Sequence, residues 1–471
     1  MSIFNSDLNF GEISSALKDV KGSIRFIGIF GSGMLPLACL LLGRGYSVSG
    51  YDRRAEGEKA ELVPGITLSS HTEVEWSGVS LAVYSLAIDE NDAEVVAARS
   101  HGIPLISRAQ LLGVLMSEAR VRISVSGSHG KSTTTAIIDH ILTLANRSHT
   151  SVSGATLSSG ASYVDGGGEI FLAEACEYKD SFLRLYPTHQ IITSVELDHT
   201  DYFASLDDIR ASFLRAAERS EVALINIDDR VAGSIADELM EKGREHTANV
   251  LTYGESDRAS YRLCNVRGSG NITRFSVAHG TDTFDLETSL IGEYNLYNIT
   301  AAVALTHSLG ITKTDIIRAV STFRPIDRRL SHIAEADGIP VLYDYAHHPT
   351  ELLAVITALK ERYGSVTVIF RPHTYSRTAS LWQDFISALC KADFTILLDI
   401  YPAREKPIDG ISSQNLAKHI PGAIYLGMEA AAKIALSHPS GVIALVGAGE
   451  VDRVKDDLIN LSKEHGKSER R

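Results

Sequence analysis

The sequence contains little cysteine, and none in an arrangement that holds a metal or a disulfide framework. Its four cysteines, at positions 39, 176, 264 and 390, stand far apart and form no CxxC pair. This spacing excludes zinc-ribbon and small disulfide-rich proteins. Reduced thiols are typical of the cytosol, so the pattern predicts a cytoplasmic protein.

Long apolar runs and a secretory leader are also missing. The longest apolar run, Met34 to Leu42, spans nine residues and contains Pro36, whereas a membrane-spanning helix needs about 20. The first residues are polar and acidic, unlike a signal peptide. We therefore expect no membrane insertion.

The sequence also has no excess of positive charge. The 45 Lys and Arg residues stand against 58 Asp and Glu, a net charge of −13, which argues against a nucleic-acid partner because such proteins present a basic face. A local basic site for a phosphorylated small molecule remains compatible with this charge. The hydrophobic share of 44% indicates a folded chain, and 471 residues predict about three domains.

Strand and helix patterns alternate through the whole chain, which predicts an α/β protein with parallel sheets. The first block has strands over 24–29, 46–50, 81–84 and 104–106 and a helix over 34–42. The second has strands over 122–125, 170–173, 190–195 and 222–227, helices over 133–144 and 301–309, and alternation over 261–293 that favours small antiparallel strands. The third has strands over 340–345, 366–370, 394–400 and 442–446 and helices over 349–363 and 379–391.

A glycine-containing loop follows the second block's first strand. It runs Gly127, Ser128, His129, Gly130, Lys131, Ser132, Thr133 and leads into a helix. Backbone N–H groups of such a turn bind phosphate, the lysine adds a point charge, and the serine hydroxyl reaches Mg²⁺. The full P-loop pattern has a further glycine where this chain has Val125. The prediction of a phosphate-binding loop therefore rests on the loop's position between a strand and a helix.

Acidic residues and a histidine follow the next strands. Glu174 comes directly after one strand, and the segment from Glu196 to His199 follows another. Because ligands gather at the carboxyl ends of parallel strands, we expect these groups near the phosphate loop. Oxygen ligands suit Mg²⁺, so Ser132, Glu174 and His199 are candidate metal ligands.

Further polar residues follow strands or open helices in the rest of the chain. Asn295 and Asn298 could bind an adenine edge, Asp344 a ribose hydroxyl, and Arg377 a carboxylate. In the first block, Gly28, Gly31 and Gly33 form a dinucleotide-type turn and Asp52 ends the second strand. On that turn alone, a nicotinamide-dependent dehydrogenase is an alternative.

Six ordered motifs together resemble the Mur ligase family along nearly the whole chain. They span residues 126–133, 174–183, 196–201, 344–351, 372–378 and 401–408. The resemblance implies a Rossmann-like UDP-sugar domain over 1–118, a central P-loop ATPase domain over 119–325 and a C-terminal Rossmann-like, amino-acid-binding domain over 326–471.

The resemblance also implies a reaction and its ligands. ATP, with Mg²⁺, phosphorylates the lactyl carboxylate of UDP-N-acetylmuramate, and the amine of L-alanine attacks the acyl phosphate in a step of peptidoglycan precursor synthesis. The implied catalytic residues are Lys131, Glu174, His199, His348 and Arg377. The implied ATP-binding residues are 127–133 with Asn295, Arg329 and Asp344. The implied UDP-sugar-binding residues are Gly31, Ser32, Gly33, Met34, Asp52 and Ser85. The implied amino-acid-binding residues are His347, His373 and Arg377.

Three points stay open on the sequence. A related ligase that attaches a recycled peptide to UDP-N-acetylmuramate shares the fold and the ATP chemistry, although the segments 174–178 and 372–377 favour L-alanine as the acceptor. Either His347 or His348 can accept the proton of the attacking amine. The chain is a monomer or a weak homodimer.

Overall fold

The computed structural model describes residues 8–52, 63–69, 74–200, 202–243, 249–403, 405–438 and 440–468. Asp201 and Arg404, which lie in two of the motifs above, and the first seven residues fall outside this set. The chain forms two compact units. The first comprises residues 1–267, 274–288 and 297–323, and the second residues 268–273, 289–296 and 324–471.

Five parallel strands form the first sheet, in the order β3-β2-β1-β4-β5. The strand order reverses at β1, so the loop after β1 opens on the crevice where such sheets bind ligands. The elements are α1 (Phe10–Lys18), β1 (Ser23–Ile27), α2 (Leu35–Gly43), β2 (Ser47–Tyr51), β3 (Ile66–Leu68), η3 (Trp76–Gly78), β4 (Val79–Tyr84), α3 (Ala93–Ser100), β5 (Leu105–Ser107) and α4 (Arg108–Ser117).

The second sheet has ten strands in the order β15-β14-β13-β12-β11-β10-β6-β9-β7-β8. Its centre is parallel, and two-residue links join β13, β14 and β15 into hairpins, which confirms the antiparallel prediction. Its strands are β6 (Val121–Ser126), β7 (His149–Val152), β8 (Tyr163–Asp165), β9 (Ile170–Glu174), β10 (His189–Ile192), β11 (Val222–Asn226), β12 (Asn249–Gly254), β13 (Tyr261–Ser269), β14 (Ile272–His279) and β15 (Asp282–Thr288).

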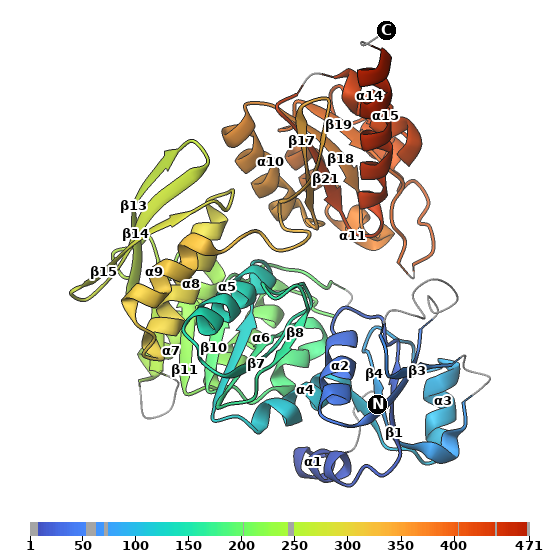
Figure 1. Cartoon of the computed structure of the whole chain (residues 1–471), viewed down its shortest axis with the longest axis vertical. Coiled ribbons are helices and arrows are strands. Elements are labelled where there is room, and N and C mark those ends of the chain that lie inside the picture. Colours follow the sequence, from blue (N-terminus) through green and yellow to red (C-terminus); the bar gives the residue numbers. More distant parts are fainter. Residues whose placement is uncertain are drawn as a thin grey trace. The chain divides into compact units, whose positions relative to one another are not determined.

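Helices connect these strands and cover the sheet (Figure 1). They are α5 (Lys131–Leu144), η4 (Tyr178–Arg184), α6 (Leu206–Glu218), α7 (Arg230–Lys242), α8 (Tyr294–Ser308) and α9 (Lys313–Thr322). The phosphate loop lies between β6, at the centre of the sheet, and the N-terminus of α5. The carboxyl ends of β9 and β10 flank it because both strands pair with β6.

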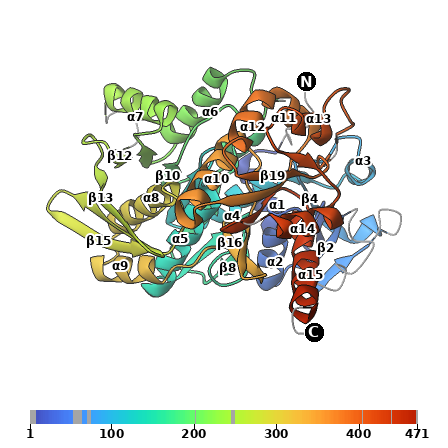
Figure 2. The same cartoon turned by 90° about the horizontal axis from the view of Figure 1, so that it is seen from above.

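The third sheet has the order β16-β17-β21-β18-β19-β20 and is parallel except for the β16–β17 pair. Separate apolar clusters lie under α10 with α12 and under α14 with α15, so helices cover both faces (Figure 2). The elements are β16 (Ser331–Ala336), β17 (Ile339–Asp344), α10 (Pro349–Tyr363), β18 (Val366–Arg371), α11 (Tyr375–Ser380), α12 (Trp382–Leu389), β19 (Phe394–Leu397), α13 (Ser413–Ala417), β20 (Ile424–Tyr425), α14 (Met428–Ser437), β21 (Val442–Gly447), η5 (Val451–Arg453) and α15 (Val454–Ser468).

The three-domain α/β prediction is confirmed, and several element boundaries differ from it. The helix predicted over 379–391 is two helices, α11 and α12, because Leu381 leaves the helical region at φ −112° and ψ 25°. The strands predicted over 190–195 and 394–400 end at Ile192 and Leu397. The helix predicted over 301–309 starts earlier, at Tyr294. Within the described ranges, no helix has both the length and the apolar character to cross a membrane.

A buried ion pair attaches β7 to α5. His149 Nε2 lies 3.0 Å from Asp139 Oδ1, and His149 Nδ1 lies 2.7 Å from the carbonyl oxygen of Arg147. Burial lowers the pKa of His149, but the hydrogen bonds to Asp139 and Arg147 outweigh it, so the pKa lies above its usual value. Ser158 donates to the other Asp139 oxygen at 3.2 Å. The pair therefore also holds the loop after β7.

Replacing His149 with alanine leaves the Asp139 carboxylate buried without its cation. We expect the free energy of unfolding to fall by about 3–5 kcal/mol. Because the folded-state pKa of His149 is raised, the stabilisation is complete below about pH 6.5 and is lost as the pH rises through that pKa. Denaturant titrations at several pH values measure this difference.

The matched control is Arg120→Ala, which removes an exposed ion pair with Glu169. The Arg120 side chain is 76% solvent-accessible and that of Glu169 is 65%. We expect its effect to stay within about 0.5 kcal/mol. A His149→Ala effect that does not change with pH would contradict an ionised pair.

Candidate active site

The phosphate loop folds tightly because two of its glycines have no room for a side chain. Gly127 has φ +140° and Gly130 has φ +82°, and a Cβ would collide with the Thr193 hydroxyl at the first and with the Asn298 amide at the second. No side chain caps the N-terminus of α5. Its first N–H groups therefore face the loop, as an anion site requires.

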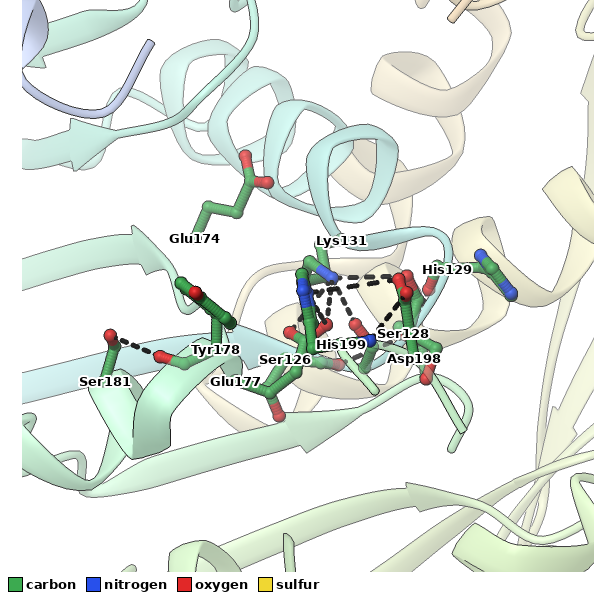
Figure 3. A network of polar contacts seen from close by, with 12 residues as sticks. Ser126, Ser128, His129, Lys131, Glu174, Glu177, Tyr178, Ser181, Asp198 and His199 are labelled. Atoms are coloured by element: carbon green, nitrogen blue, oxygen red, sulfur yellow. Dashed lines mark hydrogen bonds and ion pairs between the residues drawn. The ribbon is translucent and has the colours of Figure 1, made fainter. Parts of the chain in front are cut away.

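Lys131 lies folded over this loop. Its ammonium donates to the carbonyl oxygens of Gly127 and Ser128 and to the carboxylate of Glu177, whose oxygens lie 3.1 and 3.3 Å from Nζ. Only 2% of the Glu177 side chain is solvent-accessible. The lysine is thus held inside the loop by one buried carboxylate (Figure 3).

The same carboxylate contacts His199. Glu177 Oε1 lies 3.6 Å from His199 Nε2, and the Tyr178 ring packs on the imidazole at a centroid distance of 4.8 Å. Burial raises the pKa of Glu177, but Lys131 and His199 outweigh it and lower it below its usual value. Burial lowers the pKa of Lys131, and Glu177 reverses this and raises it. Lysine and glutamate are therefore both charged at neutral pH.

Glu174 is the last residue of β9, and its carboxylate lies beside the first turn of α5; no dashed line joins it to the Glu177 cluster in Figure 3. Its Oε1 accepts a hydrogen bond from Ser132 Oγ at 3.1 Å, and its Oε2 accepts from Ser153 Oγ and the Gly154 N–H, both at 2.9 Å. Of the three predicted metal ligands, the structure brings Ser132 and Glu174 together. It places His199 beside Glu177.

The rest of the loop is tied to the segment after β10. Ser128 Oγ donates to the carbonyl of Glu196 at 3.3 Å and accepts from its N–H at 2.8 Å, while His129 Nε2 lies 3.3 Å from the Glu196 carboxylate. His199 itself has φ +54°, an unusual conformation outside glycine. These contacts set where the histidine lies relative to the loop.

The predicted UDP-sugar residues surround the turn after β1. Asp52 is 8% solvent-accessible, and its Oδ2 accepts the Phe30 N–H at 3.1 Å, so this acid holds the turn. Met34 is buried at the start of α2. Gly31 and Gly33 lie in the same turn, and the Ser85 hydroxyl accepts the Ala87 N–H in the loop after β4.

Asp344 and Asn295, predicted to hold nucleotide, make structural contacts in the second unit. Asp344 accepts the N–H groups of Leu330 and Ala346 at 2.8 and 2.7 Å. Burial raises its pKa to about 6, against the opposing charge of Arg329. Asn295 donates to the carbonyl of Ile291 at 2.8 Å. Asp344 thereby fixes the chain at the start of β16.

The predicted amino-acid residues cluster beyond β17 and β18. His373 Nδ1 lies 3.1 Å from Arg377 Nη1, and its ring stacks on Tyr401 at 5.8 Å. The His347 ring meets His373 edge to face at 5.5 Å. His348 caps the N-terminus of α10, where its Nδ1 accepts the Thr350 N–H at 3.4 Å. The three predicted amino-acid residues and the predicted catalytic His348 therefore follow the ends of β17 and β18, the two strands that flank β21.

Sequence reasoning missed Glu177, which the structure places against Lys131 and His199. Glu177 lies three residues after Glu174 in the same motif, and a second acid after a strand that borders the phosphate loop was the available signal. Nothing in the sequence distinguishes the two acids. In the structure, Glu174 accepts hydrogen bonds from Ser132, Ser153 and the Gly154 N–H, and Glu177 meets Lys131.

Replacing Glu177 with glutamine removes the counter-charge of a buried lysine. We expect the free energy of unfolding without ligand to fall by about 3–5 kcal/mol. ATP should raise the melting temperature of Glu177→Gln more than that of the parent, because its phosphates then pair with Lys131 without competition. Thermal unfolding with and without ATP and Mg²⁺ measures both effects.

Glu169→Gln is the matched control, since Glu169 is exposed and pairs with exposed Arg120. It should change neither quantity measurably. Equal ATP-induced shifts in Glu177→Gln and the parent would show that Glu177 does not occupy the position of a phosphate.

Comparisons with known proteins cover each part of the chain. Three family models match: "Mur ligase family, catalytic domain" over residues 23–120, "Mur ligase middle domain" over 125–306 and "Mur ligase, glutamate ligase domain" over 328–449. The UDP-N-acetylmuramate--L-alanine ligase of Desulfotalea psychrophila is 34% identical over 458 residues, covering 93% of this chain and 98% of its own. That of Clostridium novyi is 36% identical over 418 residues, covering 86% and 88%.

Solved structures show the same fold. The UDP-N-acetylmuramate-alanine ligase of Thermotoga maritima superposes with a TM-score of 0.77 at 22% identity, over 94% of this chain and all of its own. A murein peptide ligase of Psychrobacter arcticus gives 0.70 at 19% identity, over 93% and 99%. At these identities the likeness concerns the fold alone.

Proposed function

The chain belongs to the Mur ligase family, and from this we propose that it joins L-alanine to the lactyl carboxylate of UDP-N-acetylmuramate at the expense of ATP. The observation that carries the proposal is the similarity to UDP-N-acetylmuramate--L-alanine ligases at 33–34% identity over more than nine-tenths of both chains. It is an ADP-forming carboxylate–amine ligase of peptidoglycan precursor synthesis. Because its substrates are soluble nucleotides and an amino acid, we place the reaction in the cytoplasm.

The chemistry proceeds in two balanced steps. A carboxylate oxygen of the substrate attacks the γ-phosphorus of ATP, and ADP leaves. The amine of L-alanine then attacks the carbonyl carbon of the acyl phosphate, inorganic phosphate leaves, and a base takes the amine proton. Two anions must meet in the first step, so positive charge at the phosphates is the main catalytic demand. Lys131 supplies it by exchanging the Glu177 carboxylate for phosphate oxygens.

A magnesium ion suits the donors around the loop. The oxygens of Ser132 and Glu174 lie 3.1 Å apart, a spacing that two ligands of one Mg²⁺ adopt at bond lengths of about 2.1 Å. Glu177 and His199 form a second candidate pair, since the Glu177 carboxylate is released when Lys131 turns to phosphate. Bound there, the ion would neutralise charge on the phosphate oxygens.

The two histidines differ in which nitrogen holds the proton. His347 Nδ1 lies 2.9 Å from the carbonyl oxygen of Tyr345, which only accepts, so this nitrogen carries the proton and Nε2 has the lone pair. His348 Nδ1 accepts a backbone N–H, which places its proton on Nε2. We therefore assign amine deprotonation to His347 Nε2. His373 and Arg377 bind the carboxylate of the amino acid.

Two alternatives predict different products. A peptide-attaching ligase would release phosphate with a tripeptide, and the murein peptide ligase structure shares the fold. A dehydrogenase would reduce a nicotinamide cofactor, but that reading leaves the Lys131–Glu177–His199 cluster without a role. The domain limits and the monomer or weak homodimer remain predictions.

The proposal is tested by phosphate release. Purified protein receives ATP, Mg²⁺ and UDP-N-acetylmuramate with L-alanine, glycine, L-serine or a tripeptide. We expect release with L-alanine and formation of the amide by mass spectrometry. Absence of release with every acceptor would refute ligase activity, and release with the tripeptide alone would favour the peptide-attaching enzyme.

Lys131→Ala should lower this turnover by about 10³-fold, since it removes the charge at the transferred phosphoryl group. Lys242→Ala is its control, because Lys242 forms exposed ion pairs on α6 and α7. Full turnover in Lys131→Ala, or an equal loss in the control, would contradict the role of Lys131.

His347→Gln should remove the acidic limb of the pH profile of L-alanine-dependent turnover, whereas His348→Gln should keep it. The reason is the lone pair that only His347 presents at Nε2 in its neutral form. Profiles of kcat/KM for L-alanine compare the two variants. Loss of the limb in His348→Gln alone would reverse the assignment.

A further inference from the structure

Two backbone hydrogen bonds of the same spacing shape the segments that follow β9 and β10. After β9, the Asp180 N–H donates to the carbonyl oxygen of Glu177 at 3.0 Å. After β10, the Tyr202 N–H donates to the carbonyl oxygen of His199 at 2.8 Å. Each bond joins residues three positions apart. Each segment therefore has an inner residue, Glu177 or His199, in the cluster around Lys131, and an outer residue, Asp180 or Tyr202.

Side chains join the two segments at both ends. At the inner end, Glu177 Oε1 lies 3.6 Å from His199 Nε2. At the outer end, the Tyr202 hydroxyl donates to Asp180 Oδ2 at 2.9 Å. The Tyr178 ring packs between them, with its centroid 4.8 Å from that of His199 and 6.5 Å from that of Tyr202 (Figure 3). A change at the outer end is therefore felt at the inner pair.

Asp180 is itself anchored to α6, a helix that packs against η4, β10 and β11. Its Oδ1 accepts a hydrogen bond from the Ser212 hydroxyl, and its Oδ2 lies 3.3 Å from Arg215 Nη2. The rings of Phe182 and Phe213 meet edge to face at 5.0 Å and hold η4 against the same helix. Since the helix is packed on the sheet, the Asp180 carboxylate offers Tyr202 a fixed point of attachment.

His199 needs such an attachment because its backbone has a rare conformation. A φ of +54° is uncommon outside glycine and persists only where the surroundings enforce it. The His199 N–H donates to Asp198 Oδ1 at 2.7 Å, and its carbonyl oxygen accepts the N–H groups of Tyr202 and Phe203 at 2.8 and 3.0 Å. The second contact depends on where Tyr202 lies, and Asp180 holds Tyr202 in place.

We propose that Asp180 and Tyr202 form a positioning pair that sets the separation of Glu177 and His199, and with it the affinity of those two side chains for a divalent cation. This inference rests on the proposed function, in which Glu177 and His199 are a candidate pair of ligands. Asp180 and Tyr202 do not touch the cation. They act through the two backbone hydrogen bonds, as partners outside the ligand set do when they fix the orientation of metal ligands. Mg²⁺ demands near-ideal geometry, so small shifts of its donors are costly.

Cation binding to the purified full chain tests the pair without any catalytic turnover. Mn²⁺ serves as the probe, because the electron paramagnetic resonance signal of the free ion gives Kd for Mn²⁺ in the presence of saturating ADP. Tyr202→Phe and Asp180→Ala should each raise this Kd about 10-fold and change Kd for ADP without metal less than about 2-fold. Asp180→Asn keeps an oxygen that accepts the Tyr202 hydroxyl and should restore most of the affinity.

Arg215→Ala is the matched control, because it removes a partner of the same carboxylate and leaves the Tyr202 hydroxyl in place. It should change Kd for Mn²⁺ less than about 2-fold. The double variant of Asp180→Ala and Tyr202→Phe should bind Mn²⁺ as weakly as Asp180→Ala alone, since both changes remove one hydrogen bond. Tyr202→Phe keeps the ring, so its melting temperature should match that of the parent.

Turnover with L-alanine gives a second readout. In Tyr202→Phe, the Mg²⁺ concentration for half-maximal rate should rise about 10-fold, and kcat at saturating Mg²⁺ should stay within about 2-fold of the parent value. A general loss of folded enzyme would lower kcat and leave the Mg²⁺ requirement unchanged.

Several outcomes overturn the positioning role. Unchanged Mn²⁺ binding in Tyr202→Phe, or an equal weakening of metal-free ADP, would refute it. Losses that multiply in the double variant would show that Asp180 and Tyr202 act separately. If L-alanine supports turnover in the parent and Mn²⁺ binding does not depend on the pair, the ligase proposal stands and this one fails. If Mn²⁺ binding depends on the pair but no acceptor supports turnover, the ligase proposal alone fails.

Discussion

Lys131 and Glu177 form the buried ion pair on which the proposed phosphate site depends. An enzyme that transfers a phosphoryl group needs a cation inside a tight strand-to-helix turn, and such a cation is costly to bury without a counter-charge. Glu177 supplies that charge, and it keeps the ammonium against the carbonyls of Gly127 and Ser128. The loop thus has one compact arrangement that phosphate oxygens can take over.

Several acids that lie at ligand-binding positions hold the backbone around the sites. Asp52 binds the Phe30 N–H, Glu174 the Gly154 N–H, and Asp344 two N–H groups at the start of β16 and after β17. A carboxylate that accepts from backbone N–H groups sets the shape of a loop, and in the proposed function that shape presents glycine N–H groups and cations to anionic ligands. The net charge of −13 therefore coexists with positive sites, because the cations are local and the acids are internal partners.

The three sheets place this chemistry in comparable positions. In each, a polar segment follows a central parallel strand, where neighbouring strand ends converge. In the first unit this brings the segments after β9 and β10 against the loop after β6. In the second unit His347 meets His373 from the ends of β17 and β18, which lie on either side of β21. The strand order, rather than any single motif, makes these residues neighbours.

The sequence by itself determined the α/β class, the strand-to-helix position of Lys131, and the set of segments that carry polar residues. These follow from local causes: apolar runs form the buried strands, glycines allow positive φ, and Pro349 opens α10 as expected from its fixed φ. Only the tertiary structure decided which acid meets which cation. Glu177 pairs with Lys131, whereas Glu174 is engaged by Ser132, Ser153 and the Gly154 N–H. Such pairings depend on strand order and on single backbone turns. They join residues that lie far apart in the sequence, so no local sequence pattern predicts them.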